Sequence, residues 1–156
     1  MRRRIIAPFA LAASLLAGAT GCTLSAEIAT KKTYEASDGV GAVMGNVALR
    51  NVLLISNDQG EANLVMTVVN SSEADVSLLV QYGDGVSRTT QALPIAALPQ
   101  RTRVGEDGTL ALVMASDNLT AGAVFPVYFQ YGDVPGELLF VPILDGSLPE
   151  YELYVP

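Results

Sequence analysis

A period-two alternation of apolar and polar residues is the feature that most constrains the fold of this chain. It recurs in short segments separated by Gly, Asp, Asn and Pro: 46–55, 63–70, 76–82, 109–115, 123–131 and 137–143. Such alternation, with β-branched and aromatic residues at the apolar positions, is typical of strands that bury one face. No segment shows the pattern of a long amphipathic helix.

The same period predicts which side chains share a face. In segment 46–55 we expect four apolar residues on one side, namely Val47, Leu49, Leu53 and Ile55. Similar sets are expected downstream: Leu64, Met66 and Val68; Val76, Leu78, Val80 and Tyr82; Leu110, Leu112 and Met114; Phe125, Val127, Phe129 and Tyr131. Pro126 falls inside its segment, which predicts an edge strand or a bulge, because proline cannot donate to a ladder.

Short strands at this spacing predict an all-β fold, an antiparallel immunoglobulin-like β-sandwich of about seven strands. Asp84-Gly85 and Asp107-Gly108 are turn dipeptides that fit this arrangement. The chain has no Trp and one Cys, so the disulfide and tryptophan of a true antibody domain are missing.

The N-terminal residues 1–21 have the three-part order of a secretory signal peptide. Arg2 to Arg4 precede an apolar run from Ile5 to about Ala17, and small residues follow. The final Ala19-Thr20-Gly21-Cys22 resembles a lipobox, in which the Cys thiol receives a diacylglycerol and the leader is cut just before it. Cys22 is therefore the expected lipidation site. The alternative is an ordinary signal peptide with an incidental Cys.

The three expected parts of the chain are the signal peptide, a tether and one folded domain. Residues 22–44 start at Cys22, are rich in small polar residues and show no strand or helix period, which predicts a flexible tether. Residues 45–156 are expected to form the β-sandwich domain. A lipid anchor at Cys22 would hold that domain on the extracytoplasmic face of the cell membrane.

Charge excludes one class of partner. Removal of the leader leaves six basic and sixteen acidic residues, a net charge of −10. A domain of this charge repels the phosphates of DNA and RNA, so no nucleic-acid binding is expected.

The residue types needed for common catalytic and metal sites are missing. The chain has no His, which removes a His-activated nucleophile and the usual zinc and copper ligand sets. Met66 and Met114 lie in apolar strand patterns and are expected in the core, with Met44 the remaining candidate for a methionine site. A carboxylate pair for glycoside hydrolysis stays open on composition, although no Trp is present for sugar stacking. We expect no catalytic residue, no metal and no cofactor.

Two further features have both a functional and a structural interpretation. Gln81-Tyr-Gly-Asp84 is repeated as Gln130-Tyr-Gly-Asp133, either as twin binding loops or as strand ends that run into turns. The C-terminal segment 148–156 carries Tyr151, Leu153 and Tyr154 between acidic residues. It is either a partner-docking segment, since Tyr is favoured at interfaces, or a last strand packed on its own sheet.

Several segments resemble the actinobacterial LpqE-type lipoproteins. They are 36–51, with sequence ASDGVGAVMGNVALRN; 64–71, LVMTVVNS; 125–129, FPVYF; and 139–143, LFVPI. The resemblance implies an immunoglobulin-like domain on the outer face of the plasma membrane. Some members of that family are grouped with periplasmic copper chaperones of the PCuAC type, and some are associated with envelope or respiratory membrane complexes. The copper ligands of the chaperones are His and Met, so the resemblance does not carry the copper role to a chain without His.

These observations predict a membrane-anchored lipoprotein that is not an enzyme. Its domain would serve as a binding or accessory module for an envelope or membrane protein complex, with Tyr151, Leu153 and Tyr154 as possible contacts. The alternative is a metal or small-ligand carrier related to the copper chaperones.

Overall fold

The computed structural model of the chain describes residues 36–83, 88–106, 113–116 and 118–156. These described residues belong to one compact unit. The predicted signal peptide and Cys22 lie outside the described residues, so lipidation stays a prediction. No helix among the described residues has the length and apolar character needed to cross a membrane.

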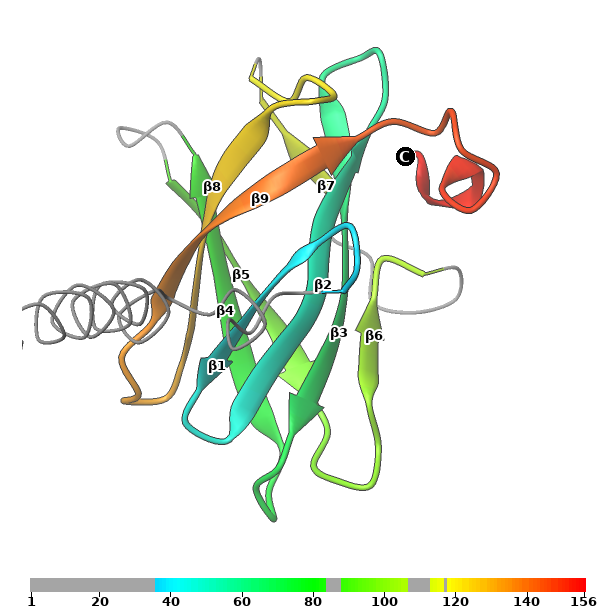
Figure 1. Cartoon of the computed structure of the whole chain (residues 1–156). Helices are drawn as coiled ribbons and strands as arrows, with labels where there is room; N and C mark the ends of the chain where they lie inside the picture. The colour runs from blue at the N-terminus through cyan, green and yellow to red at the C-terminus, as the bar shows by residue number, and fades with distance from the viewer. Residues whose placement is uncertain (1–35, 84–87, 107–112, 117) are drawn as a thin grey trace, which may run out of the picture. The chain divides into compact units, whose positions relative to one another are not determined.

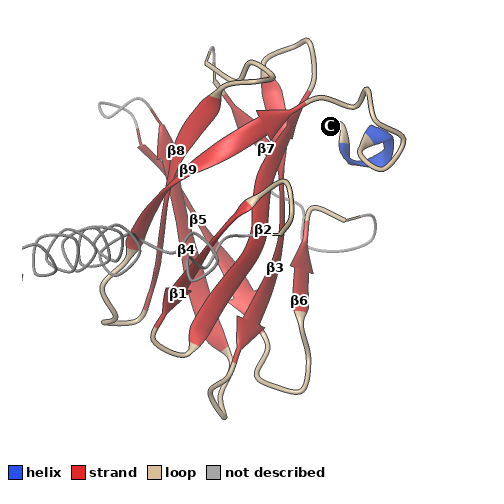
Figure 2. Cartoon of the chain, viewed as in Figure 1, coloured by secondary structure: helices blue, strands red, loops and turns tan. Residues whose placement is uncertain are grey.

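Within these residues the backbone forms nine strands and a short 3-10 turn (Figure 2). The strands are β1 (Val40–Met44), β2 (Val47–Ser56), β3 (Glu61–Asn70), β4 (Val76–Gly83), β5 (Arg88–Ile95), β6 (Thr102–Val104), β7 (Val113–Ala115), β8 (Val124–Tyr131) and β9 (Glu137–Leu144); η2 covers Glu152–Tyr154. The predicted all-β class is confirmed.

The strands form two groups that are joined by the pairing of β2 with β9 (Figure 1). One group has the order β5-β4-β8-β9, and the other has β2-β3-β6 with β1 added to β2 and β7 added to β3. All pairings within the groups are antiparallel. The joint between β2 and β9 is parallel, with Leu54 opposite Ile143 and Ile55 opposite Leu144. The fold is therefore a sandwich made by one curled, mixed sheet rather than by two purely antiparallel sheets.

A single large core fills the space between the two groups. Most of the predicted inward sets lie in it: Leu64, Met66 and Val68; Leu78, Val80 and Tyr82; Phe125, Val127 and Phe129; and Met114, with Val76 and Tyr131 packed at its margin. Leu110 and Leu112 lie outside the described residues. Burial of this many aliphatic and aromatic side chains is the main stabilising contribution.

The prediction for β2 is wrong in its second half because of a bulge. The register between β2 and β3 shifts between Arg50 and Leu53, and Asn51 has a φ of 50°. Val47 and Leu49 face the large core as expected, but beyond the bulge the alternation is inverted. Leu53 and Ile55 therefore face away from the large core and form a second cluster with Val65.

Pro126 is neither at an edge nor in a bulge. Its strand β8 lies between β4 and β9, and Pro126 is opposite Phe140 of β9. The ladder between β4 and β8 ends at Val127, so the proline lies one residue outside that ladder. A central strand tolerates the missing N–H at such a position.

The folded domain begins earlier than the predicted boundary at residue 45. Residues 40–44, which were assigned to the tether, form β1 and pair with β2. The N–H of Gly39 donates a hydrogen bond of 2.9 Å to Oδ1 of Asn51, which ties the chain entering β1 to the bulge. The interval is short and rich in Gly and Ala, which is why its strand pattern was not recognised.

Candidate functional site

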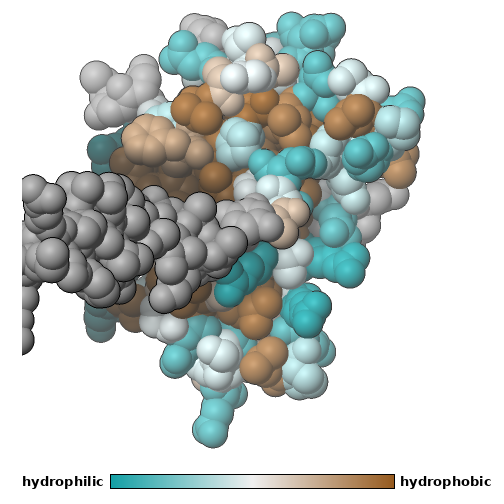
Figure 3. Space-filling view, viewed as in Figure 1, coloured by the Kyte–Doolittle hydropathy of each residue, from teal (hydrophilic) through white to brown (hydrophobic). Residues whose placement is uncertain are grey.

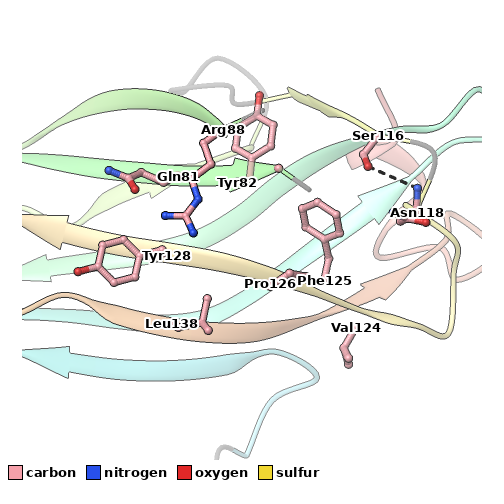
Figure 4. A pocket seen from close by; sticks show the side chains of 11 residues that line it. Gln81, Tyr82, Arg88, Ser116, Asn118, Val124, Phe125, Pro126, Tyr128 and Leu138 are labelled. Carbon is pink, nitrogen blue, oxygen red and sulfur yellow. Dashed lines mark hydrogen bonds between the residues drawn. The ribbon is translucent and has the colours of Figure 1, made fainter. Parts of the chain in front are cut away.

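An open pocket lies where β4, β5, β8 and β9 meet the segment around residue 116 (Figure 4). Its volume is about 660 Å³, within the range of about 300–1,000 Å³ common for small-molecule sites. The lining residues are Gln81, Tyr82, Gly83, Arg88, Ser116, Asn118, Val124, Phe125, Pro126, Tyr128 and Leu138. Most of this surface is apolar.

The pocket continues onto an apolar area of the outer sheet face. Because alternate residues of β8 enter the core, the intervening residues of β8 face outward with their partners on β9. The cross-strand pairs there are Val124 with Pro142, Pro126 with Phe140, and Tyr128 with Leu138. Val124, Leu138 and Phe140 are 59%, 52% and 61% exposed. Figure 3 shows brown surface in the region where β8 and β9 run. An exposed apolar area of this kind marks a binding surface more often than a single exposed residue does.

The polar groups of the pocket are few and lie on its sides. Gln81 and Arg88 come from the outer face of β4 and β5, and Ser116 and Asn118 come from the opposite side (Figure 4). The hydroxyl of Tyr82 accepts a hydrogen bond of 3.3 Å from Nε2 of Gln91. No carboxylate is present among the described lining residues; Asp84 and Asp117, neighbours in the sequence, lie outside the described part of the chain.

The described residues offer no cluster of groups for metal binding. No three of their His, Cys, Asp or Glu side chains gather closely enough to hold an ion. Met44, Met66 and Met114 all lie in the large core and are at most 2% exposed. The expectation that Met66 and Met114 are core residues is confirmed, and Met44 joins them. None of the three thioethers is accessible from solvent.

The C-terminal segment does not form the last strand considered from the sequence. It turns at Tyr151 and forms η2. Tyr151 and Tyr154 pack on the second cluster formed by Leu53, Ile55 and Val65. Leu153 points outward and is 84% exposed. The three residues predicted as one contact are thus separated, with two tyrosines facing the domain and the leucine facing solvent.

Hydrogen bonds attach this segment to Asp38, Asn57 and Asn63 of the domain. The Tyr151 hydroxyl donates to the Asp38 carboxylate, and this bond is the main reason why the pKa of Tyr151 is raised to about 12. Nδ2 of Asn63 donates to the carbonyls of Gly105 at 2.8 Å and Tyr154 at 3.1 Å. The segment closes over an apolar cluster that would otherwise face water.

The repeated Gln-Tyr-Gly-Asp sequence does not form twin loops at one site. The two copies end the neighbouring strands β4 and β8, which are antiparallel, so the copies lie at opposite ends of the pair. Tyr82 is buried and Tyr131 packs at the margin of the core. The structural interpretation describes the second copy, where β8 ends at Tyr131 and runs into a turn; the first copy ends β4 at Gly83, and Asp84 lies outside the described residues.

The sequence interpretation missed the pocket, although a signal for it was present. Residues 138–143 form a continuous apolar run, Leu-Leu-Phe-Val-Pro-Ile, rather than a strict alternation. Such a run indicates that both faces of a strand are apolar. In β9 the inner face belongs to the core and the outer face belongs to the area next to the pocket.

Comparisons with known proteins support the fold. No protein-family model matches the chain, and no curated protein matches it. Among solved structures, the apo PCuAC domain of PmoF2 is similar with a TM-score of 0.54 and 16% identity, covering 70% of this chain and 98% of that domain. The copper-bound PCuAC domain of PmoF2 has a TM-score of 0.50 and 15% identity, covering 68% and 97%. The domain therefore has a fold like that of PCuAC domains; identity this low establishes the fold alone.

Proposed function

We propose that the protein is a lipoprotein on the extracytoplasmic face of the cell membrane, whose β-sandwich domain is a non-enzymatic binding module for a component of the envelope. The observation that carries the binding role is the open, mostly apolar pocket of about 660 Å³ and its continuation over β8 and β9. The described residues that line it include no nucleophile–base pair, which argues for binding rather than catalysis.

The proposed anchor rests on the sequence 19–22 and on composition. Cys22 is the only cysteine of the chain and stands where a lipobox requires it. Each buried methylene of an acyl chain contributes about 0.8 kcal/mol, so two or three chains hold a protein on a membrane. The resemblance to LpqE-type lipoproteins points the same way, and it suggests association with a membrane protein complex.

A metal carrier is the second candidate, favoured by the likeness to the copper-bound PCuAC domain. The residue types argue against transfer of that role. The chain has no His, and its three methionines beyond the leader are buried in the core. Copper binding would thus require ligands of another kind or a rearranged core.

The anchor is tested by mass spectrometry of the protein purified from membranes. We expect a mature chain that begins at Cys22 with diacylglycerol on its sulfur. Cys22→Ser should give an unlipidated protein that is released from washed membranes. A wild-type chain starting elsewhere, or a Cys22→Ser variant that stays in the membrane fraction, would contradict the anchor.

The two binding roles are separated by titration of the mature Cys22→Ser chain with copper(I). The binding-module proposal expects no tight stoichiometric uptake, since no thioether is accessible. Stoichiometric uptake that competes with a strong chelator would replace the first proposal by the second. Cross-linking in intact cells from position 138, with the same cross-linker at exposed Leu153 as the control, tests whether the pocket side contacts an envelope component.

A further inference from the structure

The shape of the pocket favours a small ligand with an elongated apolar part. Phe125 and Tyr82 line it with rings that belong to the large core and are only 4% and 8% exposed. Val124, Tyr128 and Leu138 form its outer wall and lead to the exposed Phe140 on the same sheet face. An apolar chain could therefore start against the two rings and follow β8 and β9 outward, burying apolar surface over its length.

Arg88 is the one cationic side chain among the described residues that line the pocket. In Figure 4 the guanidinium of Arg88 points along the sheet toward Gln81 and Tyr128, which are opposite each other on β4 and β8. Arg88 makes no ion pair with any residue that the structure describes, unlike Arg103, which pairs with Glu106 at 2.9 Å. In a chain of net charge −7, an arginine that lies at an apolar pocket and has no ion pair among the described residues is the complementary charge for an anionic ligand.

We infer that this pocket binds an amphipathic molecule with an acyl chain and an anionic head, the chain lying along Phe125, Val124 and Leu138 and the head at Arg88. The inference rests on the proposed function as a binding module and names its ligand class. A free fatty acid and an anionic phospholipid of the membrane share this chemistry, so the test separates the two sources.

The test uses the mature chain with Cys22→Ser, which needs no detergent, and a fatty acid whose fluorescence rises in apolar surroundings. We expect the fluorescent fatty acid to bind saturably and to be displaced by monomeric laurate. The uncharged dodecanol should displace it about fivefold less well, because one exposed charge pair contributes about that factor to affinity. Arg88→Gln should weaken laurate about fivefold and leave dodecanol unchanged. A phospholipid source is tested by flotation with vesicles of phosphatidylglycerol compared with vesicles of phosphatidylcholine.

Val124→Asp places a charge at the outer wall of the pocket and should weaken fatty-acid binding about tenfold or more. Val43→Asp is the matched control, because Val43 and Val124 are both 59% exposed and Val43 lies on β1. Both variants keep the buried core, so circular dichroism should show the wild-type fold.

No saturable binding of fatty acid and no flotation with phosphatidylglycerol would overturn the inference, as would equal losses in the Val124 and Val43 variants. If mass spectrometry contradicted the proposed lipid anchor, the result of this binding experiment would not change. If the chain bound no amphiphile but cross-linked to a protein from position 138, the proposal of a binding module would stand and the proposal of an acyl ligand would be wrong.

Discussion

A tyrosine hydroxyl attaches the turn between β1 and β2 to the end of β8. The Asn46 N–H donates a hydrogen bond of 2.9 Å to the hydroxyl oxygen of Tyr131, 85 residues further along the chain. Gly45, the preceding residue, has a φ of +53°, and a Cβ there would lie 2.6 Å from the same oxygen. The turn therefore requires glycine for two reasons, its backbone conformation and the close approach of Tyr131.

The substitution Gly45→Ala should lower the free energy of unfolding by about 2 kcal/mol or more, because strain at positive φ adds to the contact with Tyr131. Gly132→Ala is the matched control, since Gly132 has a φ of +49° and open space where its Cβ would lie. It should lose only the backbone part, about 1 kcal/mol. Urea denaturation measures both, and equal losses would contradict the role of the Tyr131 contact.

The phenol of Tyr151 is expected to ionise at unusually high pH. Its bond to the Asp38 carboxylate favours the neutral phenol and raises its pKa from 10.0 to about 12. Since the folded pKa is the higher one, this bond stabilises the folded chain fully below pH 10 and is lost as the pH rises toward 12. The difference between the absorbance titrations of the wild-type chain and the Tyr151→Phe variant gives the ionisation of this tyrosine. Asp38→Asn should move its ionisation to lower pH, and an unchanged titration would contradict the assignment.

Among the elements, β2 and the C-terminal segment depend on each other. The bulge at Asn51 turns Leu53 and Ile55 away from the large core, onto a face that would otherwise be in water. Tyr151 and Tyr154 cover that face. An inverted face on one strand thus needs a cover from an element about 100 residues later in the chain.

Ending the chain after Gly146 removes this cover. We expect the free energy of unfolding to fall by about 2–3 kcal/mol, which is the contribution expected from partial burial of two or three apolar side chains. A dye that fluoresces on apolar surface should then bind the folded, shortened protein. Leu153→Ser is the control, because Leu153 is 84% exposed and should change stability by less than about 0.5 kcal/mol. An unchanged denaturation midpoint in the shortened chain would show that the segment does not stabilise the domain.

At the scale of the whole molecule, the two strand groups are joined through β9. Its first six residues pair with β8, and Ile143 and Leu144 pair in parallel with Leu54 and Ile55 of β2. Both groups also contribute to one core. Such a joint, with a shared core, predicts that the domain unfolds as one cooperative unit.

Ile143→Ala should therefore destabilise both groups together. Ile143 is fully buried at the joint, and its truncation should cost about 2–5 kcal/mol. Far-ultraviolet circular dichroism and tyrosine fluorescence, measured during urea denaturation, should give one coincident transition at a lower midpoint. Leu148→Ala, at a half-exposed position, should leave the midpoint nearly unchanged. Two separate transitions in the Ile143 variant would show that the groups fold independently.

The period-two pattern was sufficient to predict the class of fold and most of the inward side chains, because these depend on residues two positions apart in one strand. Leu64, Val80 and Phe129 were assigned in this way. The pattern failed at Asn51, since a bulge inserts a residue without leaving a mark in composition. The C-terminal segment carried no such pattern: Tyr151, Leu153 and Tyr154 are grouped by residue type alone, and the structure turns the two tyrosines toward the domain and Leu153 toward solvent.

The sequence by itself determined that the chain forms short strands with buried faces, and it places the one cysteine after Ala19-Thr20-Gly21, from which the lipobox is predicted. Only the tertiary structure decided which strands are neighbours, that β2 and β9 are parallel, and that Arg88 lies beside Tyr128 at an open pocket. The alternation of apolar and polar residues within a segment predicts only which face of that one strand is buried. A pocket depends instead on pairings between residues far apart in the chain, and these are set by the packing of the whole core.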